Sequence, residues 1–411
     1  MPSTNIAELI YDPSDEATRR NPYALFRQLR ERDPVHWSDA MEGWIVTDYQ
    51  LCSDMLSMNE YYSAERITGI KAHLPPEVRS YAEEVLRWLT TWMVFMDQPD
   101  HTRIRRHMAR VLNANVFATL NDNIVDICTM LLDKLPKNET IDFVREFSIQ
   151  LPGLVVLDFF GVPRERLFEV KGWSDDMMLF IGSARGVKDK YKLARNGAVS
   201  MGTLFQDMIK ARRIDPQDDV LTKLMSVDIN GDKLTDDEIV GSMMMVLNGG
   251  HETTANLINN SIMALVGHPE QLNMLRREEV AMSAAVEELL RYDAPILSIG
   301  RVVKENVVLG GRELIKGERI FAMLAAANRD PKIFSNPDEL ILNRNPNPHL
   351  TFGKGAHHCM GMPLARNEGK IVVPMIVERF KNITIMEDLN NIPWINSMVT
   401  RGPTRLPVKL S

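Results

Sequence analysis

The sequence predicts a mainly helical protein with small β-sheets, an α+β fold. Segments with apolar residues at helical spacing fill most of its 411 residues, and short alternating segments occur near the N-terminus, after residue 300 and at the C-terminus. A composition of 45% hydrophobic and 25% charged residues is typical of a globular protein with a large core. Because we find neither a repeat nor a linker, we expect one domain over residues 1–411, with β-structure roughly in 35–50, 301–322 and 383–411.

Each element has its own signal along the chain. Two apolar segments, 35–38 and 44–47, flank a polar stretch and predict a β-hairpin. A segment that is apolar on all sides and ends in Gly161-Val162-Pro163 predicts a buried helix over 151–160. Periodicity and capping residues predict further helices over 100–112, 115–135, 235–266, 280–292 and 361–380. The remaining signals predict short strands within 301–321, a strand over 405–410 and an irregular, Pro- and Asn-rich segment over 330–350.

Charge, hydropathy and cysteine content exclude several classes of protein. A formal net charge of −7 argues against nucleic acid as the main partner, since phosphate binding needs a concentrated Lys/Arg surface. No apolar stretch approaches the roughly 20 residues of a membrane-spanning helix, and residues 1–5 lack the pattern of a signal peptide. Three cysteines are too few for a disulfide framework. We therefore expect a cytoplasmic protein without a membrane anchor.

The most informative segment runs from Phe352 to Gly361 and reads FGKGAHHCMG. It places Cys359 after a glycine-rich loop and at the start of a predicted helix, where unpaired amides and the helix dipole favour a thiolate. A lone cysteine is more often an inert apolar residue. A zinc site is disfavoured because no second ligand pair has finger spacing, and a phosphate or dinucleotide loop is disfavoured because neither glycine fingerprint is present. The segment as a whole therefore favours a ligand role for Cys359.

The long helix predicted over 235–266 contains Gly249-Gly250-His251-Glu252-Thr253-Thr254 in its middle. Each glycine costs about 1 kcal/mol inside a helix, so this pair suggests a need for close access to the backbone. Taken alone, the Thr253 hydroxyl is expected to bond the Gly249 carbonyl while Glu252 reaches solvent. His251 and Glu252 begin a zinc-protease pattern, but residue 255 is alanine where that pattern needs histidine.

Together these residues resemble the cytochrome P450 family. The cysteine segment matches the family's haem-thiolate loop, F-G-x-G-x-(H/R)-x-C-x-G, at every fixed position, and 249–253 resembles its distal-helix signature, (A/G)-G-x-(D/E)-T. The resemblance extends from about residue 21 to the C-terminus. It implies a triangular, helix-rich prism with a long central distal helix, and Cys359 as the axial ligand of a haem b iron. It also implies roles for Phe352, Gly353 and Gly361 in the loop, for Gly249 in leaving room for dioxygen, and for Glu252 and Thr253 in delivering protons.

Other segments resemble further family motifs. Glu288-Leu289-Leu290-Arg291 is similar to the buried E-x-x-R motif, and Arg344 matches the third member of that network, although on their own i,i+3 charges are usually solvated. Residues 97–106 resemble D-P-P-x-H-x-x-x-R, with Gln98 in place of proline. The resemblance thus implies cationic partners for the haem propionates, since arginine suits carboxylates: His101, Arg105, Arg301 and His357. By itself, any of these arginines could instead cover a solvated helix face.

The resemblance implies a soluble, monomeric, bacterial-type monooxygenase that hydroxylates or epoxidises a lipophilic small molecule such as a polyketide, terpenoid, steroid or fatty acid. Because 411 residues leave no room for a fused redox domain, electrons from NAD(P)H would arrive through a ferredoxin or flavodoxin and its reductase. We expect these partners to dock on a basic surface formed by Arg105, Arg106, Arg110, Lys354, Arg366 and Lys370.

The 25 methionines favour an adaptable apolar pocket. By analogy with the family, its lining is expected to include Met93, Met178, Met244, Leu247, Ile296, Leu297, Ile299 and Met398. Two other functions remain open. A peroxygenase would use the same thiolate without a redox partner, and a haem sensor or carrier would not activate dioxygen.

Overall fold

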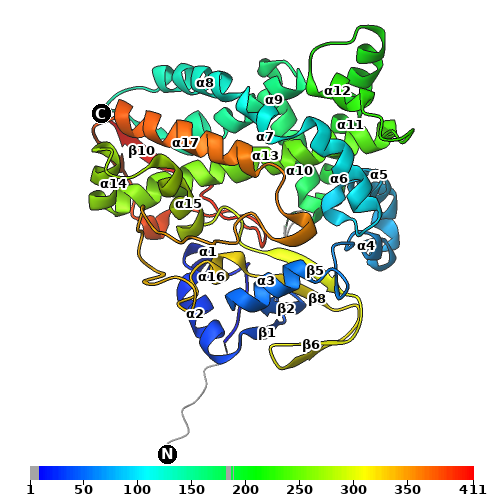
Figure 1. Cartoon of the computed structure of the whole chain (residues 1–411), viewed down its shortest axis with the longest axis horizontal. Helices are drawn as coiled ribbons and strands as arrows, with labels where there is room; N and C mark the ends of the chain where they lie inside the picture. The colour runs from blue at the N-terminus through cyan, green and yellow to red at the C-terminus, as the bar shows by residue number, and fades with distance from the viewer. Residues whose placement is uncertain (1–8, 182–186, 188) are drawn as a thin grey trace, which may run out of the picture.

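The computed structural model describes residues 9–181, 187 and 189–411, apart from the side chains of 71–73. Most helices pack around α13 (Asp236–Gly267) in one part of the molecule, and the largest sheet lies beside them with α1, α2, α3 and α16 (Figure 1). The other helices are α1 Glu16–Arg20, α2 Tyr23–Arg32, α3 Tyr49–Ser57, α4 Thr68–His73, α5 Arg79–Leu89, α6 Asp100–Val111, α7 Ala114–Ala118, α8 Asn121–Lys134, α9 Gln150–Phe160, α10 Leu167–Ile181, α11 Lys190–Ile214, α12 Val220–Ser226, α14 Pro269–Arg276, α15 Met282–Tyr292, α16 Leu324–Ala327 and α17 Met362–Arg379.

The strands form three small sheets. Their bounds are β1 Val35–Ser38, β2 Gly43–Val46, β3 Tyr62–Ser63, β4 Thr140–Asp142, β5 Ile299–Val303, β6 Val307–Leu309, β7 Arg312–Leu314, β8 Arg319–Ala322, β9 Ile383–Ile385 and β10 Pro407–Leu410. The largest sheet has the order β1-β2-β8-β5-β3, and β2 pairs with β8 in parallel. The predicted hairpin is confirmed, with His36 opposite Ile45. In β5, alternation places Ile299 and Arg301 on one face and Gly300 on the other.

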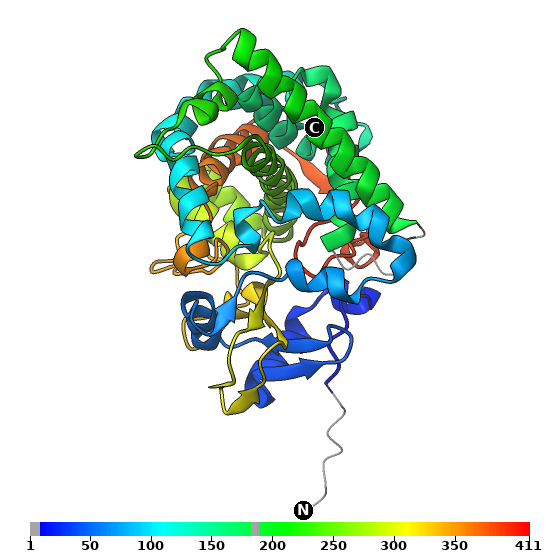
Figure 2. The same cartoon turned by 90° about the vertical axis from the view of Figure 1, so that its right-hand side faces the viewer.

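Helix α13 is the central element of the helical part. Its N-terminus carries a capping box, in which the Thr235 hydroxyl accepts from the Glu238 amide and the Glu238 carboxylate accepts from the Thr235 amide. Its 32 residues span about 48 Å, and most of its side chains are buried. Helices α9, α11, α15 and α17 pack around it, and Figure 2 shows it nearly end-on inside this ring. The predicted mainly helical class is therefore confirmed.

Two expectations about individual elements were wrong. The predicted helix over 115–135 is split into α7 and α8, because Asn113 caps α7 through the amides of Asn115 and Val116 and the Thr119 hydroxyl bonds the Val116 carbonyl. Such side-chain bonds to the backbone compete with continuation of a helix. Strands β3 and β4 lie outside the predicted β-segments, since two or three residues give no readable alternation. Within the described residues, no helix combines the length and hydropathy needed to cross a bilayer.

Candidate active site

The cysteine loop is closed by its own backbone and packs against α3. The Cys359 amide donates to the Phe352 carbonyl at 3.0 Å. Gly355 has a φ of +73°, and a Cβ there would lie 2.6 Å from the Leu56 carbonyl oxygen. A side chain at residue 355 would therefore collide with the end of α3. The glycines of this segment bring the loop backbone close to α3 and leave Cys359 at the entry to α17.

Cys359 is a free thiol with accessible surface, surrounded by hydrogen-bond donors. Burial raises the pKa of its thiol, whereas the amides of Gly361 and Met362 and the Arg105 guanidinium lower it. These donors stabilise the thiolate form against the cost of desolvation. Arg105 also donates to the carbonyl of His358 at 2.7 Å. It is therefore tied to the cysteine loop itself, a contact that the sequence did not predict.

Basic side chains gather beside this loop, and few carboxylates lie near them. His101 is 2% exposed, neither ring nitrogen has a partner, and its ring centre lies 4.1 Å from that of His357. Burial, reinforced by neighbouring cations, lowers the pKa of His101 and lowers that of His357 to about 3. Burial also lowers the pKa of Arg301 to about 10. Among the described groups, Asp97 is the carboxylate that acts on all three, and it already accepts from Ser63 and Ala64.

This imbalance tests whether a haem fits. The orphaned nitrogens of His101 and the under-compensated Arg301 need additional carboxylates, and the two haem propionates supply them. On the other side, a Cβ added to Gly249 would meet nothing within 4 Å, so the middle of α13 is open at this point. The residues present therefore fit a haem: Cys359 would bind its iron, and His101, Arg301 and His357 would hold its propionates.

Glu252 and Thr253 are an acid next to an alcohol on α13, and we call them the acid–alcohol pair. They make one contact that the sequence predicted and one that it did not. The Thr253 hydroxyl donates to the Gly249 carbonyl at 2.6 Å, as the sequence predicted. Glu252 does not simply reach solvent, because its carboxylate accepts from the Thr400 hydroxyl at 2.8 Å. Burial raises the pKa of Glu252, and the Thr400 hydrogen bond partly opposes that rise. The pair therefore includes an acid that holds its proton more strongly than a solvated glutamate.

Glu368 on α17 is a second buried acid, which the sequence analysis missed. It is 1% exposed, and one carboxyl oxygen accepts from the Thr254 hydroxyl at 3.1 Å while the other has no partner within the described part of the chain. Burial raises its pKa to about 8, and the bond from Thr254 lowers it only in part. The residues three and four positions before and after Glu368, which share its helix face, are apolar: Leu364, Ala365, Ile371 and Val372. An acid at helical spacing from apolar residues was therefore the available signal.

We expect Glu368→Gln to change how stability depends on pH. The folded-state pKa of Glu368, about 8, lies above its ordinary value of 4.5, so the native state keeps a proton that the unfolded state loses. The contribution of Glu368 to the free energy of unfolding is thus fully present below about pH 4.5 and is lost as the pH rises toward about 8. Urea unfolding of the holoprotein across this window should show a smaller loss of stability in Glu368→Gln than in the wild type. Parallel pH profiles for the two proteins would contradict the assignment.

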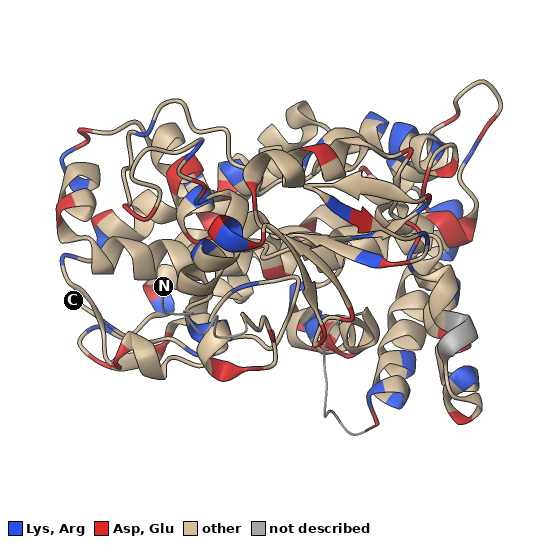
Figure 3. Ribbon diagram, turned by 90° about the horizontal axis from the view of Figure 1, so that it is seen from below, with Lys and Arg blue, Asp and Glu red and all other residues tan. Residues whose placement is uncertain are grey.

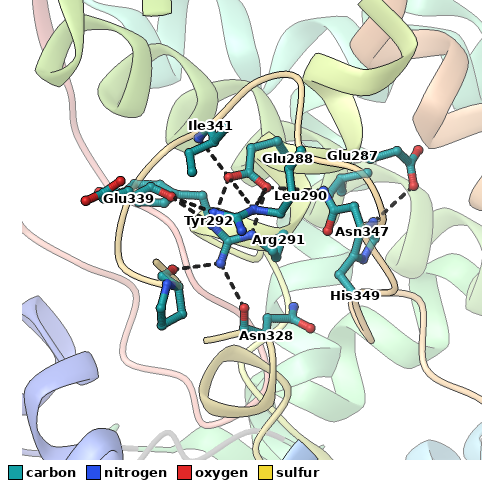
Figure 4. A network of polar contacts seen from close by, with 12 residues as sticks. Glu287, Glu288, Leu290, Arg291, Tyr292, Asn328, Glu339, Ile341, Asn347 and His349 are labelled. Carbon is teal, nitrogen blue, oxygen red and sulfur yellow. Dashed lines mark hydrogen bonds and ion pairs between the residues drawn. The ribbon is translucent and has the colours of Figure 1, made fainter. Parts of the chain in front are cut away.

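Glu288, Arg291 and Arg344 form one buried ion network. Figure 4 shows Glu288 and Arg291 of this network with several of their partners. Both Glu288 and Arg291 side chains are 0% exposed, and they pair at 2.8 Å through two hydrogen bonds. Arg344 reaches the same carboxylate at 3.0 Å, and Asn347 donates to it at 3.1 Å. Arg291 also donates to the carbonyls of Asn328, Pro337 and Glu339. The three residues named from the sequence therefore lie together, joined to the irregular segment over 330–350.

A neighbouring ion cluster was not predicted. Glu287 accepts two 2.7 Å bonds from Arg366. It also lies 3.1 Å from His349, a contact that Figure 4 shows. Burial would raise the pKa of Glu287, but the bonds from His349 and Arg366 outweigh it and lower the pKa to about 2. The guanidinium carbon of Arg366 also lies over the Phe352 ring, 5.1 Å from its centre. This cluster therefore ties α15 to the first turns of α17 and to the cysteine loop.

The predicted pocket residues separate by burial. The partly exposed ones are Met178, Ile296, Ile299 and Met398, and the buried ones are Met93, Met244, Leu247 and Leu297. Met244 and Leu247 are only 0% and 2% exposed, because α13 turns them into the packed core. The accessible face of α13 carries Val246, Gly249 and Thr253 instead. We leave Met244 and Leu247 out of the proposed pocket and add Val246. Because Val246, Gly249 and Thr253 follow the helical spacing i, i+3, i+7, Val246 could have been identified from the sequence.

The predicted docking surface is only partly available. Arg106, Arg110 and Lys370 are exposed and take part in no ion pair among the residues that the structure describes. Lys354 is exposed but donates to Ser53, while Arg366 is committed to Glu287. In the view from below, positive and negative residues are interspersed rather than segregated (Figure 3). The positive field of this surface therefore depends mainly on the three unpaired cations.

Comparisons with known proteins agree with this geometry. The family model described as "Cytochrome P450" matches residues 43–409. The polyketide biosynthesis cytochrome P450 PksS of Bacillus subtilis is 29% identical over 98% of this chain and 99% of that protein. The vitamin D(3) 25-hydroxylase of Pseudonocardia autotrophica is 32% identical over 95% and 94% of the two chains. The crystal structure of P450BioI with an acyl carrier protein carrying hexadec-9Z-enoic acid superposes with a TM-score of 0.88, at 29% identity over 96% and 99% of the chains.

The family match spans nearly the whole chain, and the structure contains a free thiol at Cys359, the buried Glu288–Arg291 ion pair and an acid next to an alcohol on α13. The chain therefore belongs to the cytochrome P450 family of haem-thiolate monooxygenases, which act on lipophilic small molecules with dioxygen and electrons derived from NAD(P)H.

Proposed function

We propose that this chain holds haem b through Cys359 and inserts one oxygen atom of dioxygen into a lipophilic small molecule. The observation that carries this proposal is a free thiol flanked by amide donors, in a loop whose His357 ring packs on His101. The ring nitrogens of His101 have no partner among the described residues, and burial lowers the pKa of the nearby Arg301. When bound, the haem supplies dioxygen binding and oxidising power. The chain's own residues fix the ligand, neutralise the propionates, exclude bulk water and position protons.

Proton delivery is assigned to Glu252 and Thr253. The Thr253 hydroxyl is oriented by its bond to Gly249, where α13 is open, and it remains able to accept a hydrogen bond. Glu252 precedes it in the same helix and is held by Thr400. Because burial raises the pKa of Glu252, a proton on this acid is less costly near neutral pH than on a solvated glutamate. The two side chains therefore supply a proton donor and an oriented hydroxyl at the open turn.

Removing the Thr253 hydroxyl tests this function. Thr253→Val keeps the side-chain shape but loses the hydroxyl, so product formation with reduced ferredoxin should fall by about 10²-fold or more. NADPH oxidation should continue, with electrons released as hydrogen peroxide. Thr253→Ser is the matched control and should stay close to the wild type.

Other outcomes would favour the alternatives. Product formation with added peroxide but never with a ferredoxin system would indicate a peroxygenase. If Thr253→Val formed as much product per NADPH oxidised as the wild type, the assigned proton delivery would be contradicted. Absence of product in both proteins would indicate a haem sensor or carrier.

The relatives support a lipophilic substrate. Their printed names include polyketide biosynthesis and vitamin D(3) hydroxylation, and one neighbouring structure contains a fatty acid on an acyl carrier protein. The proposed pocket combines the accessible face of α13 at Val246 with Ile296, Ile299 and Met398. These side chains are apolar and partly exposed, which suits an apolar ligand.

We also propose that a ferredoxin or flavodoxin docks at Arg106, Arg110 and Lys370, the exposed cations on α6 and α17. Charge reversal at Arg106 and Lys370 is expected to slow reduction by an acidic ferredoxin, most strongly at low ionic strength. Stopped-flow reduction measures this rate, and an unchanged rate would reject the surface.

The chain is further proposed to be one domain in the cytoplasm. The five-stranded sheet joins β1 to β8 across most of the sequence, and β10 pairs with β4, which supports one folding unit. Cysteines 52, 128 and 359 are all free thiols, which suits a reducing compartment.

A further inference from the structure

Thr400 joins the proposed proton donor Glu252 to a loop near the C-terminus. Its hydroxyl donates to the Glu252 carboxylate at 2.8 Å. The loop holds Thr400 in place, because the Thr400 amide donates to the Ser397 hydroxyl at 3.1 Å and Thr400 forms a β-bridge with Ile296. Thr400 is buried, with only 7% of its surface exposed. Glu252 therefore has a fixed hydrogen-bond partner that lies outside α13.

The same threonine lines a small cavity between residues 11–22 and the loop over 394–401. The cavity has room for about one water molecule, and among the described residues it is partly open to solvent. Its polar lining residues are Tyr11, Thr18, Arg19, Ser397, Thr400 and Arg401. Of these, Thr18, Arg19 and Ser397 are partly exposed, whereas Thr400 is buried. The cavity therefore connects the surface beside α1 with the residue that holds Glu252.

The other sides of Glu252 are less suited to supply protons. On α13, Gly249 and Thr253 lie where the haem and a lipophilic substrate are proposed to bind, and an apolar ligand there excludes water. On α10, Lys171 and Asp175 act on Glu252 through their charges. They pair with each other, and among the described residues neither bonds to Glu252. Thr400 is thus the neighbour that joins Glu252 to a cavity open to solvent.

A threonine hydroxyl can pass a proton because it donates one hydrogen and accepts through two lone pairs. The O–H bond of Thr400 breaks as an O–H bond forms on the Glu252 carboxylate, and the Thr400 oxygen takes a proton from a water in the cavity. That water regains its proton from bulk solvent, so one proton moves inward and no electrons are exchanged. Arg401, which also lines the cavity, is paired with Asp293 at 2.8 Å and so adds little positive charge against this movement.

We propose that Thr400 and the cavity beside it form the route by which protons from solvent reach Glu252. The inference rests on the proposed monooxygenase function, which consumes protons when the second oxygen atom of dioxygen is reduced to water. Thr400 acts in this route as a relay and not only as an anchor for the acid. A variant that fills the cavity should therefore have the same effect as one that removes the Thr400 hydroxyl.

A high-resolution crystal structure of the holoprotein is the first test. It should show an ordered water within hydrogen-bond distance of the Thr400 hydroxyl. In Thr18→Leu the larger, apolar side chain should displace this water while the bond from Thr400 to Glu252 remains. A wild-type cavity without water would overturn the proposal.

Turnover distinguishes a relay from an anchor. Each holoprotein is supplied with NADPH, ferredoxin reductase and ferredoxin, and with the lipophilic probe among dodecanoic acid, testosterone and vitamin D3 that most shifts the haem spin state. Product and hydrogen peroxide are measured per NADPH oxidised, in H2O and in D2O. Thr400→Val should lower product per NADPH by about tenfold or more, with peroxide in its place. Thr400→Ser should restore most of the product.

Thr18→Leu is the decisive variant. It should also lower product per NADPH and increase the solvent isotope effect on product formation, although it touches neither Glu252 nor Thr400. If Thr18→Leu matched the wild type while Thr400→Val was impaired, Thr400 would only anchor the acid, and the proposed route would be wrong.

Two further variants control for the loop and for α10. Thr404 lies on the same C-terminal segment but is exposed, and its hydroxyl donates to the Pro393 carbonyl at 3.3 Å. Thr404→Val should therefore match the wild type, and a loss of product there would attribute the effect of Thr400→Val to a disturbed loop. If Asp175→Asn lost product and Thr400→Val did not, protons would reach Glu252 along α10. Either result would overturn the proposal.

Failure of the proposed function gives a different result. The wild type would then form no product, and the spectrum of its reduced, carbon monoxide-bound form would lack the thiolate signature. The crystal structures of the wild type and of Thr18→Leu would still show whether water occupies the cavity beside Thr400.

Discussion

Cys359→Ser is expected to abolish monooxygenase activity and the thiolate signature in the spectrum of the reduced, carbon monoxide-bound protein. The amides of Gly361 and Met362 and the guanidinium of Arg105 favour an anionic sulfur at this position. A serine hydroxyl has a far higher pKa and remains neutral among the same donors, so it cannot replace a thiolate ligand. Absorption spectra of the purified variant, supplemented with haem, measure the effect directly.

Cys52→Ser is the matched control for this substitution. Cys52 is also a free thiol, but it is fully buried and donates to the Val46 carbonyl at 3.1 Å, a bond that a serine hydroxyl can also make. Its spectrum should equal that of the wild type. If Cys359→Ser kept the parent spectrum, or if the wild type bound no haem when it is supplied, the assignment of Cys359 as the ligand would be wrong.

Glu288→Gln is expected to cause the largest loss of stability, about 3–5 kcal/mol. The substitution removes the anion between Arg291 and Arg344, whose side chains are 0% and 5% exposed, and leaves two buried guanidinium groups uncompensated. A domain is usually stable by only about 5–15 kcal/mol, so much of the variant is expected to misfold or lose haem. Urea unfolding and the haem content of the soluble fraction measure the effect.

Glu16→Gln provides the contrast. Glu16 pairs with Arg20 at 2.8 Å on α1, but its side chain is 75% exposed, and such surface pairs contribute at most about 1 kcal/mol. Its unfolding curve should therefore overlay that of the wild type. A Glu288→Gln protein within 1 kcal/mol of the wild type would show that water or a rearranged partner compensates the two arginines.

The sequence predicted best the features that are contiguous along the chain. The loop around Cys359 and the Glu252-Thr253 pair lie within short segments, so their spacing could be read directly. The bond from Thr253 to Gly249 is likewise local, a helix residue contacting the fourth residue before it. The helices over 100–112 and 235–266 were predicted for the same reason, because amphipathic periodicity and capping are local properties, whereas α10 and α11 were not predicted.

Features that depend on packing between distant segments could not be read in this way. Thr400 reaches Glu252 across 148 residues of sequence, and Glu368 meets Thr254 across 114. Arg66 contacts β5 only because the sheet places Gly300 beside it. The rotation of α13 was also undetermined, since a helix that is apolar on most sides does not reveal which side faces a pocket. Met244 was selected for that reason, although it lies in the core.

The ion network around Glu288 has a consequence for how the protein is made. Its acid and first arginine leave the ribosome with α15, whereas Arg344 and Asn347, and the backbone carbonyls that complete the coordination, are synthesised more than 35 residues later. Until then, Glu288 can pair with Arg291 of its own helix, but its bonds from Arg344 and Asn347 cannot form. Cys359 follows shortly after Asn347 in the sequence, so the cysteine loop is translated only after all the residues of the ion network. If Cys359 is the ligand, as proposed, a nascent chain can bind the cofactor through it only after residue 359 has left the ribosome.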